Sequence, residues 1–181
     1  MSDTTPSAEI VTSHPDADLI ATLSRLGDVL AIRTLSESER AWVEAALDLS
    51  IGHPDPFIRA SMAQRCSLRQ LRRMLHDSHI AVRAACASNP FVIDIDVQLA
   101  LAGDAESVVV HALLDQVDPY RPVCDVIISG PHVAARARLA EMNLAGDLLE
   151  RLAGDPNPDV AAAAADTLAH RQRVATRRGR R

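Results

Sequence analysis

The chain has 181 residues, of which 48% are hydrophobic and 24% charged, so it can bury a core and is not a wholly disordered protein. Aromatic residues make up only 2%, and a core of small aliphatic side chains favours closely packed short helices. The net charge of −5 combines an acidic body with a basic end: residues 171–181 hold six of the 19 basic residues and no acidic one, which leaves −11 elsewhere. All 19 are Arg, which we read as the codon usage of a GC-rich bacterial genome.

The cysteines and the N-terminal residues indicate the cellular compartment in which the protein is expected. Cys66, Cys86 and Cys124 are odd in number and widely separated in the chain, which argues against a disulfide framework and against a cysteine metal site. No apolar run approaches about 18 residues, and the first residues lack the basic and apolar regions of a signal peptide. We therefore expect a cytoplasmic protein that does not enter a membrane.

Two helices are predicted before residue 50, after a disordered lead over residues 1–15. Apolar residues at steps of three and four predict the first helix over 16–33. Ser36 and Glu39 form a capping box that begins the second. The buried stripe of the second helix is expected to consist of Trp42, Val43, Ala46, Leu47 and Leu49. We interpret residues 16–50 as a two-helix N-terminal cap.

Beyond residue 50 the sequence repeats. Five segments align on an apolar residue, here called the anchor, at intervals that alternate between a shorter and a slightly longer spacing: Ile58, Val82, Val109, Val133 and Val160. Four positions after each anchor the residue is again small or apolar: Met62, Cys86, Leu113, Ala137 and Ala164. Two positions before it, three copies have proline, which suits the first position of a helix: Pro56, Pro131 and Pro158. Each anchor is therefore expected in the first turn of a helix.

A shorter helix, of α or 3₁₀ type, is predicted before each of these helices. Asp77, Asp104 and Asp155 lie five residues before their anchors, and a short apolar stretch precedes each one. A repeat of this size cannot bury its own apolar face, so the copies must stack. The sequence predicts an all-α, right-handed solenoid of about five short helical repeats over residues 51–170.

The clearest copy resembles a known family, the leucine-rich repeat variant, a short bacterial repeat. The resemblance covers roughly residues 50–170, is strongest over 71–104 and weakest over 118–143. It implies alternating α and 3₁₀ helices in a superhelix close to HEAT and armadillo arrays, although the uneven spacing leaves HEAT-like hairpins open. Some relatives bind an N-terminal iron–sulphur cluster, but residues 1–65 contain no cysteine, so no cofactor is expected. The matching pattern is Leu71-x-x-Met74-Leu75-x-Asp77-x-x-x-x-Val82-Arg83-x-x-x-Ala87-x-Asn89-Pro90.

Two groups of arginines are candidate partner-binding residues. One follows the anchor directly and either bonds a turn carboxylate, such as Asp77 or Asp55, or faces a ligand. The other group, which also includes Arg65, recurs at helical steps and is either a solvated helix face or a contact for an acidic partner. The candidates are Arg59, Arg69, Arg72, Arg73 and Arg83.

Nothing in the sequence indicates catalysis or a metal site. His76 and His79 flank Asp77, but no further ligand stands at a matching spacing. Cys86 falls in an apolar column and is expected to be a buried hydrophobe. There is no phosphate-binding loop and no nucleophile elbow. We therefore expect that the protein has no catalytic residue and is not an enzyme.

The C-terminal segment 171–181 is predicted to be a disordered basic tail. It is a candidate contact for nucleic acid or for an acidic protein through Arg173, Arg177, Arg178, Arg180 and Arg181. The scarcity of aromatic residues argues against base stacking.

The leading hypothesis is a non-enzymatic scaffold that binds a protein partner through the concave face of the solenoid. The first alternative is a nucleic-acid-associated protein that uses the tail. That class includes helical-repeat DNA glycosylases, whose basic, aromatic-lined cleft is not visible here. The second alternative is a HEAT-like accessory of a cofactor-handling enzyme. The identity of the partner and the oligomeric state are left open.

Overall fold

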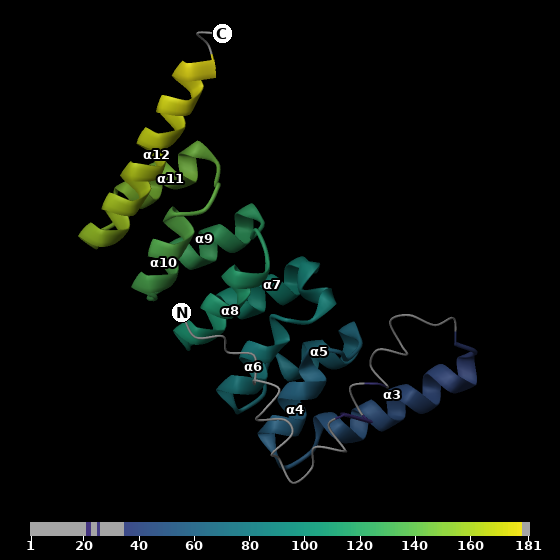
Figure 1. Cartoon of the computed structure of the whole chain (residues 1–181). Coiled ribbons are helices and arrows are strands. Elements are labelled where there is room, and N and C mark those ends of the chain that lie inside the picture. The colour runs from purple at the N-terminus through teal and green to yellow at the C-terminus, as the bar shows by residue number, and fades with distance from the viewer. Residues whose placement is uncertain (1–20, 23–24, 26–34, 179–181) are drawn as a thin grey trace. The chain divides into compact units, whose positions relative to one another are not determined.

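A computed structural model describes residues 21–22, 25 and 35–178 (Figure 1). All regular structure in these residues is helical, which confirms the all-α prediction for this part of the chain. The predicted lead over residues 1–15, and nearly all of the predicted helix over 16–33, lie outside the described residues. The chain divides into two compact units, an N-terminal unit (Met1–Val92) and a C-terminal unit (Ile93–Arg181).

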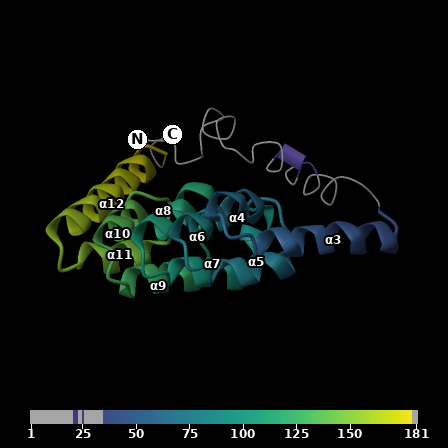
Figure 2. The same ribbon diagram turned by 90° about the horizontal axis from the view of Figure 1, so that it is seen from below.

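The described helices of the N-terminal unit form two layers. Figure 2 shows α4 and α6 in one layer, here called the second layer, and α3 and α5 in the first. Helix α4 packs on α3, α5 and α6, so each layer covers the apolar side of the other. The elements are α3 (Glu37–Ile51), α4 (Pro56–Ala63), α5 (Leu68–Met74) and α6 (Ile80–Cys86), followed by a short 3₁₀ turn, Pro90–Ile93.

The C-terminal unit repeats this arrangement. Helices α8, α10 and α12 are successive neighbours in its second layer, and α7, α9 and α11 form its first layer (Figure 2). The first-layer helices are α-helices, so the 3₁₀ form that the family resemblance implies is found, among the described residues, only at Pro90–Ile93. The elements are α7 (Ile95–Ala102), α8 (Ser107–Gln116), α9 (Arg121–Ser129), α10 (Val133–Ala140), α11 (Gly146–Ala153) and α12 (Pro158–Arg178).

Several helices begin where the sequence predicts because a side chain caps them. The capping box at α3 is confirmed: the Glu39 N–H donates to Ser36 Oγ at 3.3 Å, and the Ser36 N–H donates to Glu39 Oε2 at 2.9 Å. Asp55 accepts from the Phe57 N–H at 2.8 Å and begins α4. Asn157 accepts from the two N–H groups at the start of α12, at 3.0 and 3.3 Å.

Four of the five predicted anchors are buried, and the fourth in chain order, Val133, was wrongly aligned. Ile58, Val82, Val109 and Val160 are fully buried, whereas Val133 is 40% exposed. In its place Ala135 is fully buried, and Leu139 is buried four residues later. The helix there starts after His132, so Pro131 precedes the helix instead of opening it, and aligning on that proline shifted the register by two positions. With Ala135 as the fourth anchor, the last two intervals become more nearly equal.

Two other predictions from the sequence are wrong. Trp42 and Leu49 are 65% and 81% exposed, because the described neighbours of α3 pack on its other face, where Val43 and Leu47 are buried. Residues 171–178 are not disordered, because α12 continues to Arg178. The composition of this segment explains the helix, since Ala, Gln and Arg are good helix formers and the segment has no glycine before position 179.

Candidate interaction surfaces

Arg59, one residue after the first anchor, forms a bidentate ion pair with Asp77. Its Nε donates to Oδ2 at 2.7 Å and its Nη2 donates to Oδ1 at 2.8 Å. Nη1 donates to the His53 carbonyl at 2.8 Å, and the two charged side chains are only 13% and 11% exposed. Asp77 also accepts from the His79 N–H at 2.8 Å, at the turn before α6. The guanidinium therefore ties α4 to the turn of the next copy, a structural role.

The same device occurs in the C-terminal unit. Arg136 donates through Nε to Asp155 Oδ2 at 2.7 Å, and through Nη1 to the Gly130 carbonyl at 2.7 Å. Its side chain is 9% exposed and that of Asp155 is 5% exposed. Sequence reasoning missed Arg136, although the signal is present: in the corrected register it follows the anchor Ala135 as Arg59 follows Ile58. Aligning the fourth copy on Val133 instead of Ala135 concealed that an arginine again follows the anchor.

Arg83 completes the pattern of arginines that follow an anchor. Its Nη1 donates to the Asp77 carbonyl at 2.9 Å. As with Arg59 and Arg136, the acceptor is the carbonyl six positions before the arginine. In each case the arginine reaches back over the first turn of its own helix and fixes the preceding turn.

Both buried carboxylates are stabilised in the ionised form. Arg59 holds the pKa of Asp77 below its ordinary value through their hydrogen bonds, against the opposing effect of burial. Arg136 lowers the pKa of Asp155 in the same way, and the backbone N–H of Asn157 contributes. Both pairs are therefore charged at neutral pH.

Two exposed arginines of α5 converge on one carboxylate. Arg69 and Arg73 donate to Asp48 of α3 at 2.6 and 3.2 Å, and Gln70 donates to it at 3.2 Å. The hydrogen bond from Arg69 is the main reason that the pKa of Asp48 is lowered. The guanidiniums remain more than half exposed.

The five candidate arginines thus do not form one site. Arg69 and Arg73 surround Asp48, whereas Arg59 and Arg83 are held at the turn around Asp77. Arg72 is exposed on the same short helix as Arg69 and Arg73.

Two exposed ion pairs connect α9 and α11 with reversed polarity. Arg121 of α9 pairs with Asp147 of α11, and Arg151 of α11 pairs with Asp125 of α9. Both pairs join residues 26 positions apart. Their reciprocity fixes the relative positions of the two helices, although each exposed pair contributes little to stability.

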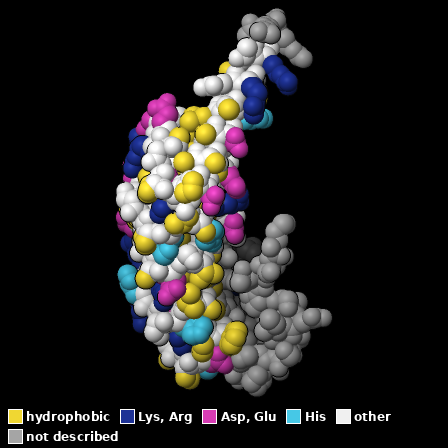
Figure 3. All heavy atoms as spheres, turned by 90° about the vertical axis from the view of Figure 1, so that its left-hand side faces the viewer, with side chains coloured by type: hydrophobic (Ala, Val, Ile, Leu, Met, Phe, Trp, Pro, Cys, Tyr) yellow, Lys and Arg dark blue, Asp and Glu magenta, His cyan; other side chains and the backbone are white. Residues whose placement is uncertain are grey.

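In four of the five copies the second layer exposes an apolar side chain at one recurring position, the residue before the anchor, whereas the fifth copy has the exposed Asp159 there. In the N-terminal unit this position holds Phe57, which is 51% exposed, and the exposed Ala81. In the C-terminal unit it holds Val108, which is 40% exposed, and the exposed Ala134 beside Val133. Figure 3 shows this side of the molecule, where hydrophobic side chains are interspersed with acidic, basic and histidine side chains.

The cysteines and histidines do not form a chemical site in the described residues. Cys66, Cys86 and Cys124 are buried and free, and burial raises the pKa of Cys66 to about 12 and that of Cys124 to about 11. His79 accepts from the Ala81 N–H through Nδ1 and caps α6. Across residues 21–22, 25 and 35–178, no group of three or more His, Cys, Asp and Glu side chains is placed to hold a metal ion. No helix among the described residues combines the length and apolar character needed to cross a bilayer.

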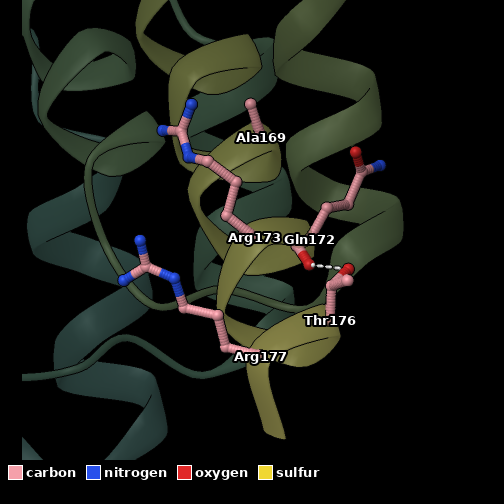
Figure 4. Close-up of a pocket in the computed structure, with 5 residues that line it drawn as sticks. All are labelled: Ala169, Gln172, Arg173, Thr176 and Arg177. Carbon is pink, nitrogen blue, oxygen red and sulfur yellow. Dashed lines mark hydrogen bonds between the residues drawn. The ribbon is translucent and has the colours of Figure 1, made fainter. Parts of the chain in front are cut away.

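The last turns of α12 form a basic surface. Ala169, Gln172, Arg173, Thr176 and Arg177 line an open depression of about 430 Å³ (Figure 4). Thr176 Oγ1 donates to the Gln172 carbonyl at 2.8 Å, a bond within the helix. Arg171 donates to the side-chain oxygen of Asn143, which follows α10. Of the predicted tail residues Arg173, Arg177, Arg178, Arg180 and Arg181, the first three belong to α12.

Comparison with known proteins gives no assignment: the chain matches no protein-family model, no curated protein and no solved structure.

Proposed function

We propose that the protein is a non-enzymatic helical-repeat scaffold that binds a protein partner. In this proposal the helix pairs continue as one right-handed solenoid of about five repeats, and the interface is the surface of the second-layer helices, which would be its concave face. The proposal includes a bacterial, cytoplasmic setting, in which buried free cysteines stay reduced.

The observation that carries this proposal is the recurrence of exposed apolar residues immediately before the anchors. Isolated apolar residues are common on protein surfaces and need no explanation. Here the same position is apolar in four of the five copies, at Phe57 and Ala81 in one unit and at Val108 and Ala134 in the other, and only α12 has an acid there, Asp159. An aligned apolar strip is the kind of surface that a partner desolvates at the centre of an interface.

The buried arginines support the same proposal, because they make the scaffold rigid. Arg59 and Arg136 each fix two successive turns through charge-assisted hydrogen bonds. A surface that is already ordered loses less conformational entropy when a partner binds. Shape and charge complementarity, without a chemical step, is then sufficient for function.

Affinity capture from the native host with variants of the C-terminal unit tests this proposal. Val108→Glu/Val133→Glu places two charges on the second layer, at positions that are each 40% exposed. The matched control, Ile93→Glu/Ile95→Glu, adds the same charge at apolar residues that are 66% and 42% exposed, the second of them on first-layer helix α7. Proteins that mass spectrometry finds with the wild type and the control should be lost with Val108→Glu/Val133→Glu. If both double variants keep the same proteins, the second layer is not the interface.

A further inference from the structure

The arginines of the C-terminal unit fall into two groups with different surroundings. Every arginine between residues 93 and 170 is paired with a carboxylate within 4 Å: Arg121, Arg136, Arg138 and Arg151. Arg173 and Arg177 have no carboxylate partner among the residues that the structure describes. These two cations are exposed on α12 and are not neutralised there.

Arg173 and Arg177 also have a defined spacing. They stand one helical turn apart, and Figure 4 shows both guanidinium groups directed to the same side of α12. Four residues of α-helix place them about 6 Å apart along the axis. Gln172 and Thr176, which line the same depression, add uncharged polar side chains at the same interval.

The positive charge here has no acidic neighbour in the sequence. Residues 167–181 contain six arginines and no Asp or Glu. The nearest acid on the helix is Asp166, about 10 Å along the axis from Arg173. The rest of the chain has a net charge of −11, whereas residues 167–181 are basic, so electrostatics favours an anionic partner at this end.

We propose that the C-terminal half of α12 binds the phosphate backbone of duplex nucleic acid without reading its sequence. Guanidinium groups bind phosphate oxygens in bidentate geometry, and Gln side chains donate to the same oxygens. A row of cations about 6 Å apart suits a polymer that presents its charges at regular short intervals. This site is separate from the apolar strip of the second layer, and neither proposal depends on the other.

The surrounding residues favour a duplex over other anionic partners. Single strands are held by stacking on aromatic side chains, and α12 has none. A membrane-binding helix needs a broad apolar face, but Val174 is the one large apolar side chain among the exposed residues 172–177. Tight protein interfaces are centred on buried aromatic or aliphatic anchors, which this surface also lacks.

Anisotropy of a labelled, mixed-sequence DNA duplex of about 20 base pairs, at about 50 to 200 mM salt, tests the proposal. For the wild-type protein, log K should fall linearly with log salt concentration. Arg173→Gln/Arg177→Gln should reduce the magnitude of that slope by about 1.8, since each lost phosphate contact removes about 0.9. Arg173→Lys/Arg177→Lys should keep most of the slope, because it keeps both charges.

The control is Arg121→Gln/Arg151→Gln, which removes the same charge from exposed arginines of the same unit. It should leave the slope unchanged. An equal effect in the two Gln double variants would overturn the proposal, because net charge alone would then explain binding. Absence of wild-type binding at about 50 mM salt would also overturn it. So would tighter binding of polyglutamate or of anionic vesicles than of the duplex, which would assign these arginines to an acidic protein or a lipid surface.

Discussion

At the scale of single residues, the most informative feature is a guanidinium that the fold has almost removed from solvent. Arg136 is 9% exposed and satisfies both a carboxylate and a backbone carbonyl. Removing one partner of a buried ion pair leaves the other charge without compensation, which costs far more than breaking a surface pair. Arg138 is two residues away and 46% exposed, so it provides the comparison.

Arg136→Met should lower the free energy of unfolding by about 3 kcal/mol or more, because Asp155 would remain buried and unpaired. Arg138→Met breaks only exposed pairs, to Asp115 and Glu141, and should cost less than about 1 kcal/mol. Urea denaturation followed by circular dichroism measures both. If the two variants lose the same free energy of unfolding, the buried pair stabilises the fold no more than the exposed pairs do.

The Arg136–Asp155 pair also predicts a pH dependence. The pKa of Asp155 is lower in the folded protein than the ordinary value of about 3.9, so the unfolded state binds more protons as the pH falls. The stabilisation is therefore complete above about pH 5 and is lost as the pH falls through the unfolded and then the folded pKa. Asp155→Asn should flatten the dependence of the unfolding free energy on pH between about 5 and 2, compared with the wild type. Parallel curves for the variant and the wild type would contradict this prediction.

At the scale of the elements, helix boundaries decide which side chains are buried. Apolar spacing was sufficient to predict the anchors Ile58 and Val82, and side-chain chemistry was sufficient to predict the capping box at Ser36. The fourth copy was misaligned because Pro131 suits two positions, the first residue of a helix and the residue before its cap. Trp42 was misplaced because steps of three and four fit two adjacent faces of α3, and the choice between them depends on which neighbours pack there. Periodicity carries no information about those neighbours.

The corrected register can be tested with two neighbouring substitutions. Ala135→Asp places a carboxylate at a fully buried position and should cost more than about 3 kcal/mol of unfolding free energy. Val133→Asp adds the same group at the exposed first residue of α10, where the helix dipole favours an acid, and should stay within about 0.5 kcal/mol of the wild type. Chemical denaturation distinguishes them. The reverse order would restore the register in which Val133 is the fourth anchor.

At the scale of the whole molecule, the repeat predicts mutual dependence among copies. No helix pair of this size buries enough apolar surface to be stable alone, so copies in contact should gain and lose structure together. The arginines that bridge successive turns, Arg59 in one unit and Arg136 in the other, add specific links between neighbouring copies. The mutual dependence of the copies is a prediction that the sequence repeat alone supports. The contacts of Arg59 and Arg136 that link neighbouring copies could be identified only from the structure.

Val82→Asp tests that dependence, because it places a charge at a fully buried anchor. The substitution should unfold the array, and a thiol reagent reports how far unfolding extends. Cys66 and Cys86 report on the N-terminal unit and Cys124 on the C-terminal unit, and all three are buried in the native protein. We expect all three to react in the variant at a pH where the wild type is inert. A folded variant with protected Cys66 and Cys86 would refute the alignment.

The exposed position of Trp42 has a practical consequence for spectroscopy. It is the chain's one tryptophan, and it lies on a face of α3 adjacent to the one that buries Val43 and Leu47. Its indole should emit at long wavelength and be quenched by acrylamide even in the native protein, so intrinsic fluorescence will change little on denaturation. Because the Trp42 emission of the protein alone is already that of an exposed indole, it can report binding. A blue shift on addition of a partner would show that the partner covers this face of α3.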